Sequence, residues 1–585
     1  MSTEYIKGTL VYKTINGKKQ PYLQWTENGK SKSRYIKKEE REQVFAALEA
    51  RQRSSGSLRS PAVPYSSRLP LEMNAVYGIQ LKEMAGRTAG FQKRDCFHIL
   101  EAFLSGPVIS RVCIVYGLRR TGKTTMLMQA IECLSAEEQA HAIYIKARPE
   151  DNMAMLNRDL DRLLDLGYKY IFLDEITLME DFIDGAALLS DIYAASGMKI
   201  VLSGTDSLGF YLSSRSELYD RTVTLHTTWI PYREHSRLLG TDDIDEYIRF
   251  GGTLLAGETA FGDPDALSDN AAFRDDESTR RYIDTAICLN IQHSLAFCHN
   301  GSHFRHLQDL YEAGELTNAI NRVIEDINHR FLVSVITRDF RSSDYGSAAQ
   351  LLRKERDPQK RTTILDSIDR DEITEKLMEI LDIRSKEKLS IGITAAHVEE
   401  IREYLRMLEL TAECPVQTLA RAGEPMDRTY ITQPGMRYSQ AQALVYTLIN
   451  DEEFSLFSRR EQKLATQKIL EDVRGRMMED IVLYETALKY PKGDVCRVDL
   501  GDGRDIDMLI YDAENDTCSI FEIKHSTSAA PAQYRIITDE EICEKITRKF
   551  GSISRRAVIY RGPSFTDAAG MEYIRVEEYL NQQPV

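Results

Sequence analysis

The sequence has little of what membrane-spanning and disulfide-stabilised proteins contain. It has no apolar run of about 18 residues, the length that a transmembrane helix needs. Its beginning, MSTEYIKGTL, has no apolar stretch of the kind that secretory signals carry, so we expect no such signal. The nine cysteines are odd in number and form no Cys-x-x-Cys pair, which argues against a disulfide framework or a zinc ribbon. We therefore expect a protein of the reducing cytoplasm with no membrane partner.

Basic residues are scarce in most of the chain but not at its beginning. The 585 residues carry 75 Lys and Arg against 90 Asp and Glu, a net charge of −15. Residues 1–70 hold 14 basic and 6 acidic residues, a net of +8, which leaves 61 and 84, a net of −23, for the rest. A basic arm on an acidic body favours a polyanion as partner, and DNA is the polyanion we expect first. A solvated basic face is the alternative.

The length predicts roughly three to five domains, since domains usually span roughly 100–200 residues. In residues 1–53 we expect a small basic sheet followed by a helix. Its strands are predicted at Tyr5–Lys13, Pro21–Thr26 and Ser31–Lys37, separated by two Asn-Gly pairs that favour tight hairpins. The helix is predicted at about 38–53, and a linker rich in Ser, Pro and Arg follows over 54–74.

Alternating strand and helix patterns predict an α/β domain with a parallel sheet over 75–238. Helical patterns predict a helical region over 239–380 and a winged-helix-like and helical region over 381–470. In the latter, a helix at Ala395–Leu408 precedes a β-like stretch that ends at Thr432. A final α+β pattern fills residues 471–585.

A phosphate-binding loop stands at the start of the α/β domain. Val112–Tyr116 is a short apolar strand, Gly117–Thr124 reads GLRRTGKT, and a helical pattern follows over Thr125–Cys133. This is GxxxxGKT in its strand–loop–helix context, where glycines let backbone N–H groups surround phosphates. We expect Lys123 to reach the β- and γ-phosphates of ATP and Thr124 to ligate Mg²⁺. The predicted nucleotide-binding residues are Gly117, Arg120, Thr121, Gly122, Lys123, Thr124, Thr125, Asp174 and Ser203.

A second apolar strand supplies the acids of the same site. Tyr170–Glu175 reads YIFLDE, so Asp174 is expected to hold Mg²⁺ and Glu175 to orient the attacking water. The next strand, Lys199–Gly204, ends near the γ-phosphate. Ser203 or Thr205 is expected to sense that phosphate there, with helix capping as the alternative for Thr205.

Several motifs together resemble bacterial and archaeal ATPases of the AAA-like superfamily. They are GLRRTGKTT, FLDE, VLSGT, the segment Trp229–Glu234 after Arg221, and Tyr247 with Gly251-Gly252, within a resemblance over roughly residues 75–545. It implies a helical and winged-helix middle and a C-terminal restriction-endonuclease-like domain. It also gives Arg221 a catalytic role as the arginine that contacts the γ-phosphate, with a surface salt bridge as the alternative.

The C-terminal region contains the residue types of a PD-(D/E)xK nuclease. Glu522 and Lys524 are two residues apart on a predicted strand and therefore share one face of it. Asp507 lies on the preceding predicted strand, or Asp505 if the register is shifted, and Glu479 lies on a predicted helix. We expect Glu479, Asp507 and Glu522 to bind Mg²⁺ and Lys524 to position the nucleophile. Residues 471–585 have 15 basic and 22 acidic residues, a net of −7, so a domain kept only for packing or recognition is the alternative.

One weaker cluster is Cys298, His299, His303 and His306, a candidate zinc site or a polar helix junction. Two functions remain open. One is an ATP-dependent enzyme that processes nucleic acid. The other is an ATP-driven switch whose inactive nuclease-like domain recognises a partner. A homo-oligomer or a protein partner fits both.

Overall fold

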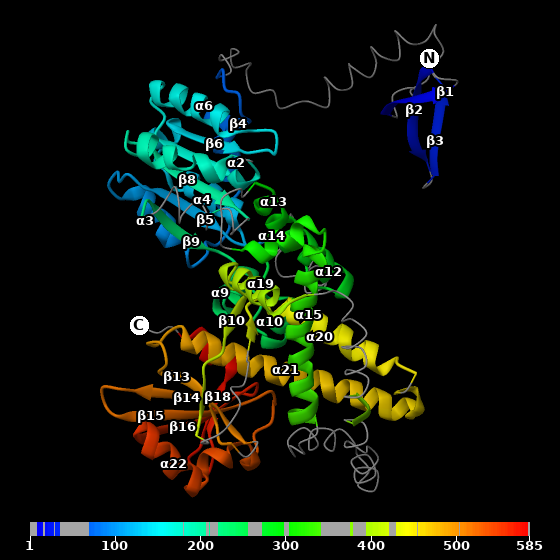
Figure 1. Cartoon of the computed structure of the whole chain (residues 1–585), viewed down its shortest axis with the longest axis vertical. Coiled ribbons are helices and arrows are strands. Elements are labelled where there is room, and N and C mark those ends of the chain that lie inside the picture. Colours follow the sequence, from blue (N-terminus) through cyan, green and yellow to red (C-terminus); the bar gives the residue numbers. More distant parts are fainter. Residues whose placement is uncertain are drawn as a thin grey trace. The chain divides into compact units, whose positions relative to one another are not determined.

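The computed structural model describes residues 9–15, 18–27, 30–35, 69–179, 181–205, 210, 220–254, 272–297, 304–340, 375–377, 393–419, 429–452, 454–501 and 504–582. The chain divides into two compact units, Met1–Pro70 and Leu71–Val585. Figure 1 labels most of the helices and strands of both units.

The first unit contains an antiparallel sheet in the order β1-β2-β3. The strands are β1 (Thr9–Ile15), β2 (Lys18–Glu27) and β3 (Lys30–Tyr35). Ile15 pairs with Lys18 and Glu27 pairs with Lys30, so each connection is one Asn-Gly dipeptide. The two predicted hairpins are thereby confirmed. The predicted helix over 38–53 and most of the predicted linker over 54–74 lie outside the described residues.

The second unit begins with a sheet in the order β4-β6-β7-β8-β5-β9. Its strands are β4 (Ala75–Tyr77), β5 (Val112–Tyr116), β6 (Ala142–Lys146), β7 (Tyr170–Asp174), β8 (Lys199–Gly204) and β9 (Thr222–His226). Only β4 is antiparallel to its neighbour among these paired strands. Burial on both faces explains why the residues of β5 and β7 are apolar without alternation. The predicted parallel sheet is confirmed.

Helices connect these strands. They are α2 (Gly78–Gly86), α3 (Phe97–Ser105), α4 (Lys123–Cys133), α5 (Ala136–Ala140), α6 (Met153–Asp165), α7 (Phe182–Gly185) and the short turns η3 (Ile176–Leu178) and η4 (Leu189–Ala194). Caps define several of their starts. The Asn152 side chain, for example, accepts a hydrogen bond of 2.9 Å from the Met155 amide and so satisfies a first-turn N–H of α6.

The middle of the chain is helical, as predicted. Its helices are α9 (Tyr232–Leu239), α10 (Ile244–Phe250), α12 (Asp276–Ile283), η5 (Asp284–Cys288), α13 (Leu289–Phe297), α14 (Arg305–Glu312), α15 (Leu316–Ser334), η6 (Val335–Phe340), α19 (Ala395–Met407), α20 (Pro434–Ile449), η8 (Phe454–Leu456) and α21 (Arg459–Ala487). After α19, strands β10 (Thr411–Glu413) and β12 (Thr429–Ile431) pair antiparallel. A helix and a two-stranded sheet thus occur in the predicted winged-helix region, whereas the complete winged helix stays a prediction.

The C-terminal sheet has the order β11-β13-β14-β15-β16-β18-β17. Its elements are β11 (Val416–Thr418), β13 (Val495–Asp499), β14 (Asp505–Asp512), β15 (Thr517–Lys524), η9 (Pro531–Tyr534), η10 (Ile536–Thr538), α22 (Glu540–Phe550), β16 (Ser552–Tyr560), β17 (Phe565–Thr566), β18 (Glu572–Arg575) and α23 (Val576–Asn581). β13, β14 and β15 are antiparallel neighbours, and β15 is parallel to β16. β11 comes from the predicted winged-helix region but pairs with β13. Strand pairing depends on which backbones are adjacent in the folded chain, and not on their distance in the sequence.

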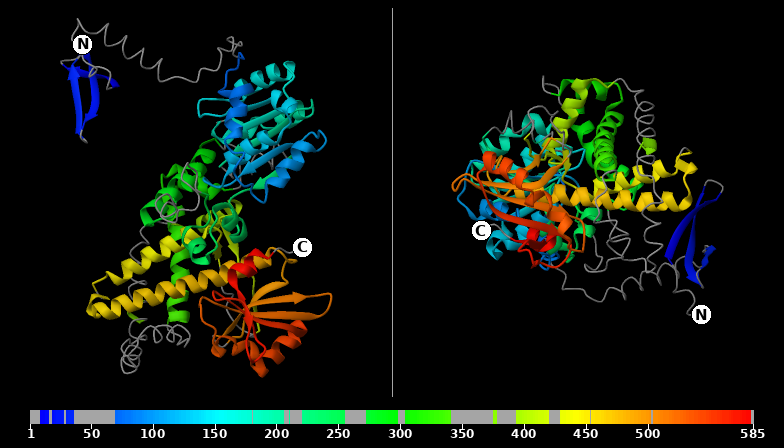
Figure 2. Two further views of the ribbon diagram at one scale, coloured as in Figure 1. Left: turned by 180° about the vertical axis from the view of Figure 1, so that it is seen from behind. Right: turned by 90° about the horizontal axis from the view of Figure 1, so that it is seen from below.

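The predicted boundary at residues 470 and 471 is wrong because α21 runs through it without a break. α20 and α21 lie side by side (Figure 2). One apolar core joins Tyr247 of α10, Val445 of α20 and Ile481 of α21 to Phe521 and Ile523 of β15. The helical middle and the C-terminal sheet therefore share a core across the predicted boundary.

A buried carboxyl group lies where α9 meets α21. Glu485 Oε1 accepts a hydrogen bond of 2.7 Å from the Tyr232 amide, the first N–H of α9. The bond satisfies a helix N-terminal donor that has no partner within its own helix. Burial raises the pKa of Glu485 to about 7, and the hydrogen bonds from Tyr232 and Tyr247 oppose that rise.

We expect the Glu485→Gln variant to lose part of the pH dependence of stability. The carboxyl has a pKa of about 4.3 in the unfolded chain, so stability is retained below that value and falls as the pH rises toward the folded pKa of about 7. Glutamine does not ionise. The variant should therefore gain about 2–3 kcal/mol relative to wild type between pH 5 and pH 8. Denaturant unfolding followed through Trp229, whose ring lies 5.7 Å from that of Tyr484, measures this gain. Glu471→Gln on the same helix is the control, and an equal pH profile in both variants would contradict the assignment.

Candidate functional site

The predicted phosphate-binding loop connects β5 to α4, and two glycines permit its path. A Cβ on Gly117 would lie 2.4 Å from Thr227 Oγ1 and 2.8 Å from the Thr228 amide, so no other residue fits there. Gly122 has a φ of 89° and caps α4, whose first residue is Lys123. The loop therefore ends at a helix N-terminus with Lys123 in its first turn, an arrangement that binds phosphate.

Lys123 is folded back on the loop that precedes it. Its ammonium donates hydrogen bonds to the carbonyls of Gly117 at 2.8 Å and Leu118 at 2.9 Å. Burial lowers the pKa of Lys123 to about 8, while the nearby carboxylates Glu175 and Asp174 oppose that change. Because the hydrogen-bond partners of this buried ammonium are neutral carbonyls, an anionic ligand would stabilise it.

The remaining carbonyls of the loop are held by other parts of the chain. The Arg119 carbonyl accepts from the Tyr282 hydroxyl at 2.9 Å, the Arg120 carbonyl from the Leu254 amide at 2.7 Å, and the Thr121 carbonyl from Arg94 Nη1 at 2.7 Å. Because peptide groups are planar, carbonyls that point outward turn the N–H groups that follow them toward the inside of the loop. That orientation suits a phosphate cradle. The Arg120 side chain itself is exposed, and Thr125 is half-buried in the first turn of α4.

Asp174 lies at the centre of the polar groups beside the loop. Its Oδ2 accepts hydrogen bonds from Thr124 Oγ1 at 2.9 Å and the Tyr144 hydroxyl at 2.7 Å, and its Oδ1 accepts from Ser203 Oγ at 2.7 Å. The side chain is buried. β8 lies between β5 and β7, which explains how Ser203 comes between the loop and the acidic strand. Tyr144 was not predicted, because a tyrosine in an apolar strand gives no signal in the sequence.

Glu175 follows Asp174 in a left-handed conformation with a φ of 56°. Strand β7 ends just before this residue, and the short turn η3 follows directly after it. The Thr205 hydroxyl lies 3.4 and 3.5 Å from the two Glu175 carboxylate oxygens. Ser203 thus contacts Asp174, whereas Thr205 faces Glu175.

These groups fit a nucleotide with magnesium. A threonine hydroxyl and a carboxylate are oxygen donors of the kind Mg²⁺ prefers, and a buried ammonium suits phosphate. Lys123, Thr124, Asp174, Glu175 and Ser203 meet at the carboxyl end of a parallel sheet, the usual ligand position in such sheets.

The prediction for Arg221 needs correction within this chain. Arg221 directly precedes β9, and Thr222 pairs with Val112 at the amino end of β5. The loop begins at the other end of that strand, so Arg221 lies at the opposite edge of the sheet. Its Nη1 forms an ion pair of 2.9 Å with Asp191 on the surface. The alternative of a surface salt bridge therefore applies to Arg221. The parallel register of β5 and β9 places it at the edge of the sheet opposite the loop.

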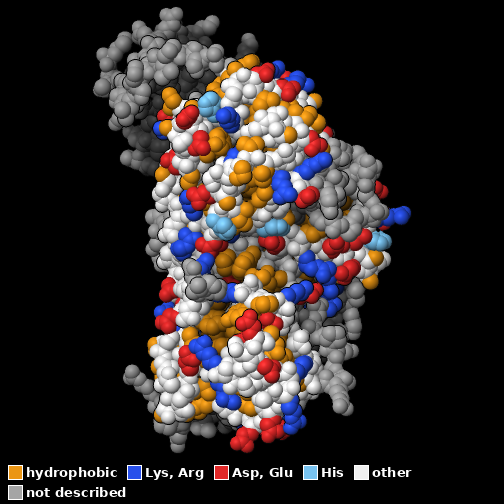
Figure 3. Space-filling model, turned by 90° about the vertical axis from the view of Figure 1, so that its left-hand side faces the viewer, with side chains coloured by type: hydrophobic (Ala, Val, Ile, Leu, Met, Phe, Trp, Pro, Cys, Tyr) orange, Lys and Arg blue, Asp and Glu red, His pale blue; other side chains and the backbone are white. Residues whose placement is uncertain are grey.

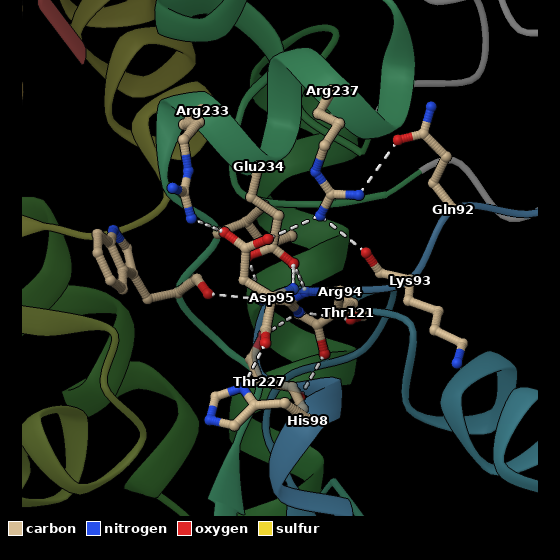
Figure 4. Close-up of polar contacts among 12 residues, drawn as sticks. Gln92, Lys93, Arg94, Asp95, His98, Thr121, Thr227, Arg233, Glu234 and Arg237 are labelled. Carbon is tan, nitrogen blue, oxygen red and sulfur yellow. Dashed lines mark hydrogen bonds and ion pairs between the residues drawn. The ribbon is translucent and has the colours of Figure 1, made fainter. Parts of the chain in front are cut away.

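A buried arginine, not predicted from the sequence, joins the loop to the helical region (Figure 4). Arg94 forms an ion pair with Glu234 of α9 at 2.5 Å, and both side chains are buried. Its Nη1 also donates to the carbonyls of Thr121 and Thr227, and its Nη2 donates to that of Trp229. One guanidinium therefore fixes the loop, the end of β9 and the start of α9. Arg94 precedes the loop motif and belongs to no local pattern that would have indicated it.

The C-terminal residues predicted to form a nuclease site lie close together. Lys524 Nζ is 2.8 Å from Glu522 Oε2 and 3.1 Å from Asp507 Oδ2. Glu479 on α21 joins them through Arg497, whose Nη2 lies 2.9 Å from Glu479 and 3.1 Å from Asp507. The convergence follows the expectation, and the central position of Arg497 does not.

No group of three or more metal-ligating side chains was found in the described part of the chain. In the C-terminal cluster, Arg497 and Lys524 stand between carboxylates that a shared metal ion would have to bring together. Of the other predicted cluster, Cys298, His299 and His303 lie outside the described residues. His306 is described, and its ring centroid lies 5.5 Å from that of His397.

Comparisons with known proteins support the nucleotide site. Residues 110–235 match the family described as "AAA domain", so the chain contains an AAA-type ATPase domain, which implies that it binds a nucleotide. Residues 1–46 match a domain of unknown function (DUF6788). No curated protein matches the chain.

A solved structure titled "Structure of C. elegans PCH-2" matches with 13% identity and a TM-score of 0.19. The match covers 40% of this chain and 63% of that one, less than two thirds of its length. At this TM-score the likeness carries no argument. Within the described residues, no helix combines the length and the apolar character needed to span a membrane.

We expect Tyr282→Phe to weaken ATP binding, because it removes the hydroxyl that holds the Arg119 carbonyl. The same hydroxyl accepts from Gln433 Nε2 at 3.3 Å, so two polar groups lose a partner. The loss should cost about 1–2 kcal/mol of stability and lower ATP affinity about three- to tenfold. Calorimetric titration measures the affinity. Tyr404→Phe, in the same apolar core, is the matched control, and equal affinities in the two variants would show that this bond does not shape the loop.

Proposed function

We propose that this protein binds and hydrolyses ATP with Mg²⁺ at the loop between β5 and α4. The observation that carries the proposal is the meeting of Thr124, Tyr144 and Ser203 on the buried Asp174, next to a loop that ends in Lys123. In this proposal Lys123 leaves the carbonyls of Gly117 and Leu118 for the β- and γ-phosphates. Thr124 and Asp174 hold magnesium, Asp174 through water.

The proposed catalytic base is Glu175. Its carboxylate accepts the proton of the water that attacks the γ-phosphate. Thr205 orients that carboxylate, and Ser203 keeps Asp174 in place. Magnesium, when bound, offsets the negative charge on the phosphate oxygens. The remaining residues of the proposed nucleotide site are Gly117, Arg120, Thr121, Gly122 and Thr125.

We expect Lys123→Ala to abolish tight ATP binding, because it removes the cation of the loop. Glu175→Gln should keep the affinity and lower turnover about 100-fold or more, the scale of a lost general base. Fluorescent-nucleotide titration and phosphate release measure the two effects. Lys146→Ala, an exposed lysine at the end of β6, is the control. Normal turnover in Glu175→Gln would refute its assigned role.

The nucleotide state is proposed to act on the C-terminal domain through two sets of contacts. In the first, Arg94 links the loop to Glu234 of α9, and the first amide of α9 binds Glu485 of α21. In the second, Asp245 of α10 lies 2.7 Å from His525 Nε2 and 2.7 Å from Arg561 Nη1.

These contacts end beside the C-terminal cluster. His525 directly follows Lys524, and α21 carries Glu479. A change in the loop on ATP binding would therefore alter the contacts of His525 and of α21, provided that α9 and α10 move with the loop.

The proposal has two forms, which differ in the role of the C-terminal domain: an active nuclease or an inactive recognition domain. Cleavage of nucleic acid is supported by the order α21-β13-β14-β15-α22-β16 and by the convergence of Glu479, Asp507, Glu522 and Lys524. A switch with an inactive domain is supported by Arg497, which bonds the carboxylates that cleavage would need for a metal. We favour the switch on this observation. Magnesium-dependent cleavage that is lost in Lys524→Ala would favour the first form instead.

Nucleic acid, DNA first, is the proposed partner of the basic first unit. On the face drawn in Figure 3, basic and acidic side chains are interspersed over the described residues, with no continuous basic surface there. The excess positive charge of the chain is in residues 1–70.

A homo-oligomer or a protein partner is also part of the proposal. So is a cytoplasmic location, which the eight free cysteines of the described residues support.

We expect deletion of residues 1–60 to weaken DNA binding and to flatten its dependence on salt. Lys and Arg contacts to phosphates release counterions, and the number of such contacts sets the salt slope. Fluorescence anisotropy with labelled DNA at several salt concentrations measures both quantities. ATP hydrolysis without DNA is the control, because the deleted residues belong to a separate compact unit. Unchanged affinity at low salt would exclude the basic arm as the binding element.

A further inference from the structure

Arg497 lies at an irregularity between β13 and β14. Cys496 pairs with Leu509 and Val498 pairs with Ile506, so Asp507 and Met508 together face the single residue Arg497. An extra residue in one strand re-aims the side chains beside it. Here it places Asp507 against the Arg497 guanidinium, and that guanidinium is buried.

The Arg497 donors reach three carboxylates on two elements. Nε bonds Asp505 Oδ2 at 2.7 Å, and Nη2 bonds both Glu479 Oε2 at 2.9 Å and Asp507 Oδ1 at 3.1 Å. Glu479 is on α21, whereas Asp505 and Asp507 are on β14. The guanidinium therefore joins the helix to the sheet at the point where a shared metal ion would have to lie.

The oxygens of Asp507 are already in use. Oδ1 accepts from Arg497, and Oδ2 accepts from the Ile523 amide at 2.8 Å and from Lys524 at 3.1 Å. Glu479 Oε2 accepts a second bond from Arg476 at 2.8 Å. A metal ion would have to replace several charge-assisted hydrogen bonds in a buried place, which costs more than binding to free carboxylates.

The cluster comes close to charge balance through its own side chains. Its acids are Glu479, Asp505, Asp507 and Glu522, and its bases are Arg476, Arg497 and Lys524. Lys524 contacts Oε2 of Glu522, whereas Oε1 of the same carboxylate is buried with no hydrogen-bond partner among the described residues.

We infer that Arg497 is the built-in counter-ion of this cluster and keeps divalent metal ions out of it. Removal of its charge would convert the cluster into a metal site that uses Glu479, Asp507 and Glu522. The inference deepens the proposed switch, which rests on the same Arg497 contacts, and it holds whether or not the chain hydrolyses ATP.

Electron paramagnetic resonance of Mn²⁺ added to the full chain without nucleotide tests this inference. Mn²⁺ accepts the same carboxylate ligands as Mg²⁺. Wild type and Asp507→Asn should bind equal amounts of Mn²⁺, since the cluster binds none. Arg497→Met should bind about one further Mn²⁺ per chain. The double variant Arg497→Met/Asp507→Asn should lose that ion.

Arg548→Met is the matched control, because Arg548 pairs with Glu544 on an exposed helix face of the same domain. It should bind as wild type does. Binding by wild type that Asp507→Asn removes would overturn the inference, and this comparison does not require Arg497→Met to fold. A folded Arg497→Met variant that gains no Mn²⁺ would overturn it as well. An inactive ATPase site would leave all these results unchanged, so the inference and the proposed ATP hydrolysis fail separately.

Discussion

The buried ion pair between Arg94 and Glu234 is the contact on which the arrangement around the nucleotide loop depends. Arg94 donates to backbone carbonyls of the loop and of the segment after β9, and Glu234 anchors the same guanidinium to α9. A buried charge is tolerated only when it is paired and fully bonded. Any shift of α9 must therefore take Arg94 with it or break the pair, and a shift of Arg94 reaches the Thr121 carbonyl. The loop and the helical region are mechanically joined.

Polar contacts also join separate elements farther along the chain. Glu485 is buried where α9 meets α21, Asp245 bonds His525 and Arg561 across the next junction, and Arg497 holds α21 to β14. Each contact lies between elements that are distant in sequence and share an apolar core. Apolar burial has little directional preference, whereas these polar contacts have fixed partners and add direction to the packing at each junction.

The two candidate sites differ in how far their residues depend on a ligand. At the nucleotide loop, the hydrogen bonds of the Lys123 ammonium go to backbone carbonyls, so an anion completes the site. In the C-terminal cluster, Arg476, Arg497 and Lys524 already pair with the carboxylates and offset most of their charge. Similar residue types thus lead to different chemistry, because the cation that completes the second site belongs to the chain itself.

Local patterns in the sequence were sufficient for the elements that local physics controls. The Asn-Gly hairpins, the strand–loop–helix around Lys123, the acidic end of β7 and the Glu522–Lys524 pair were predictable, because turn conformation, helix capping and strand alternation act over a few residues. The tertiary structure alone decided the rest. It placed Arg221 at the far edge of the sheet, carried α21 through the predicted boundary, paired β11 with β13, and brought Arg94 to the loop and Arg497 between the carboxylates. Each of these outcomes depends on contacts between distant segments. The sequence alone does not show that an arginine is buried, because its acidic partners are distant in the chain.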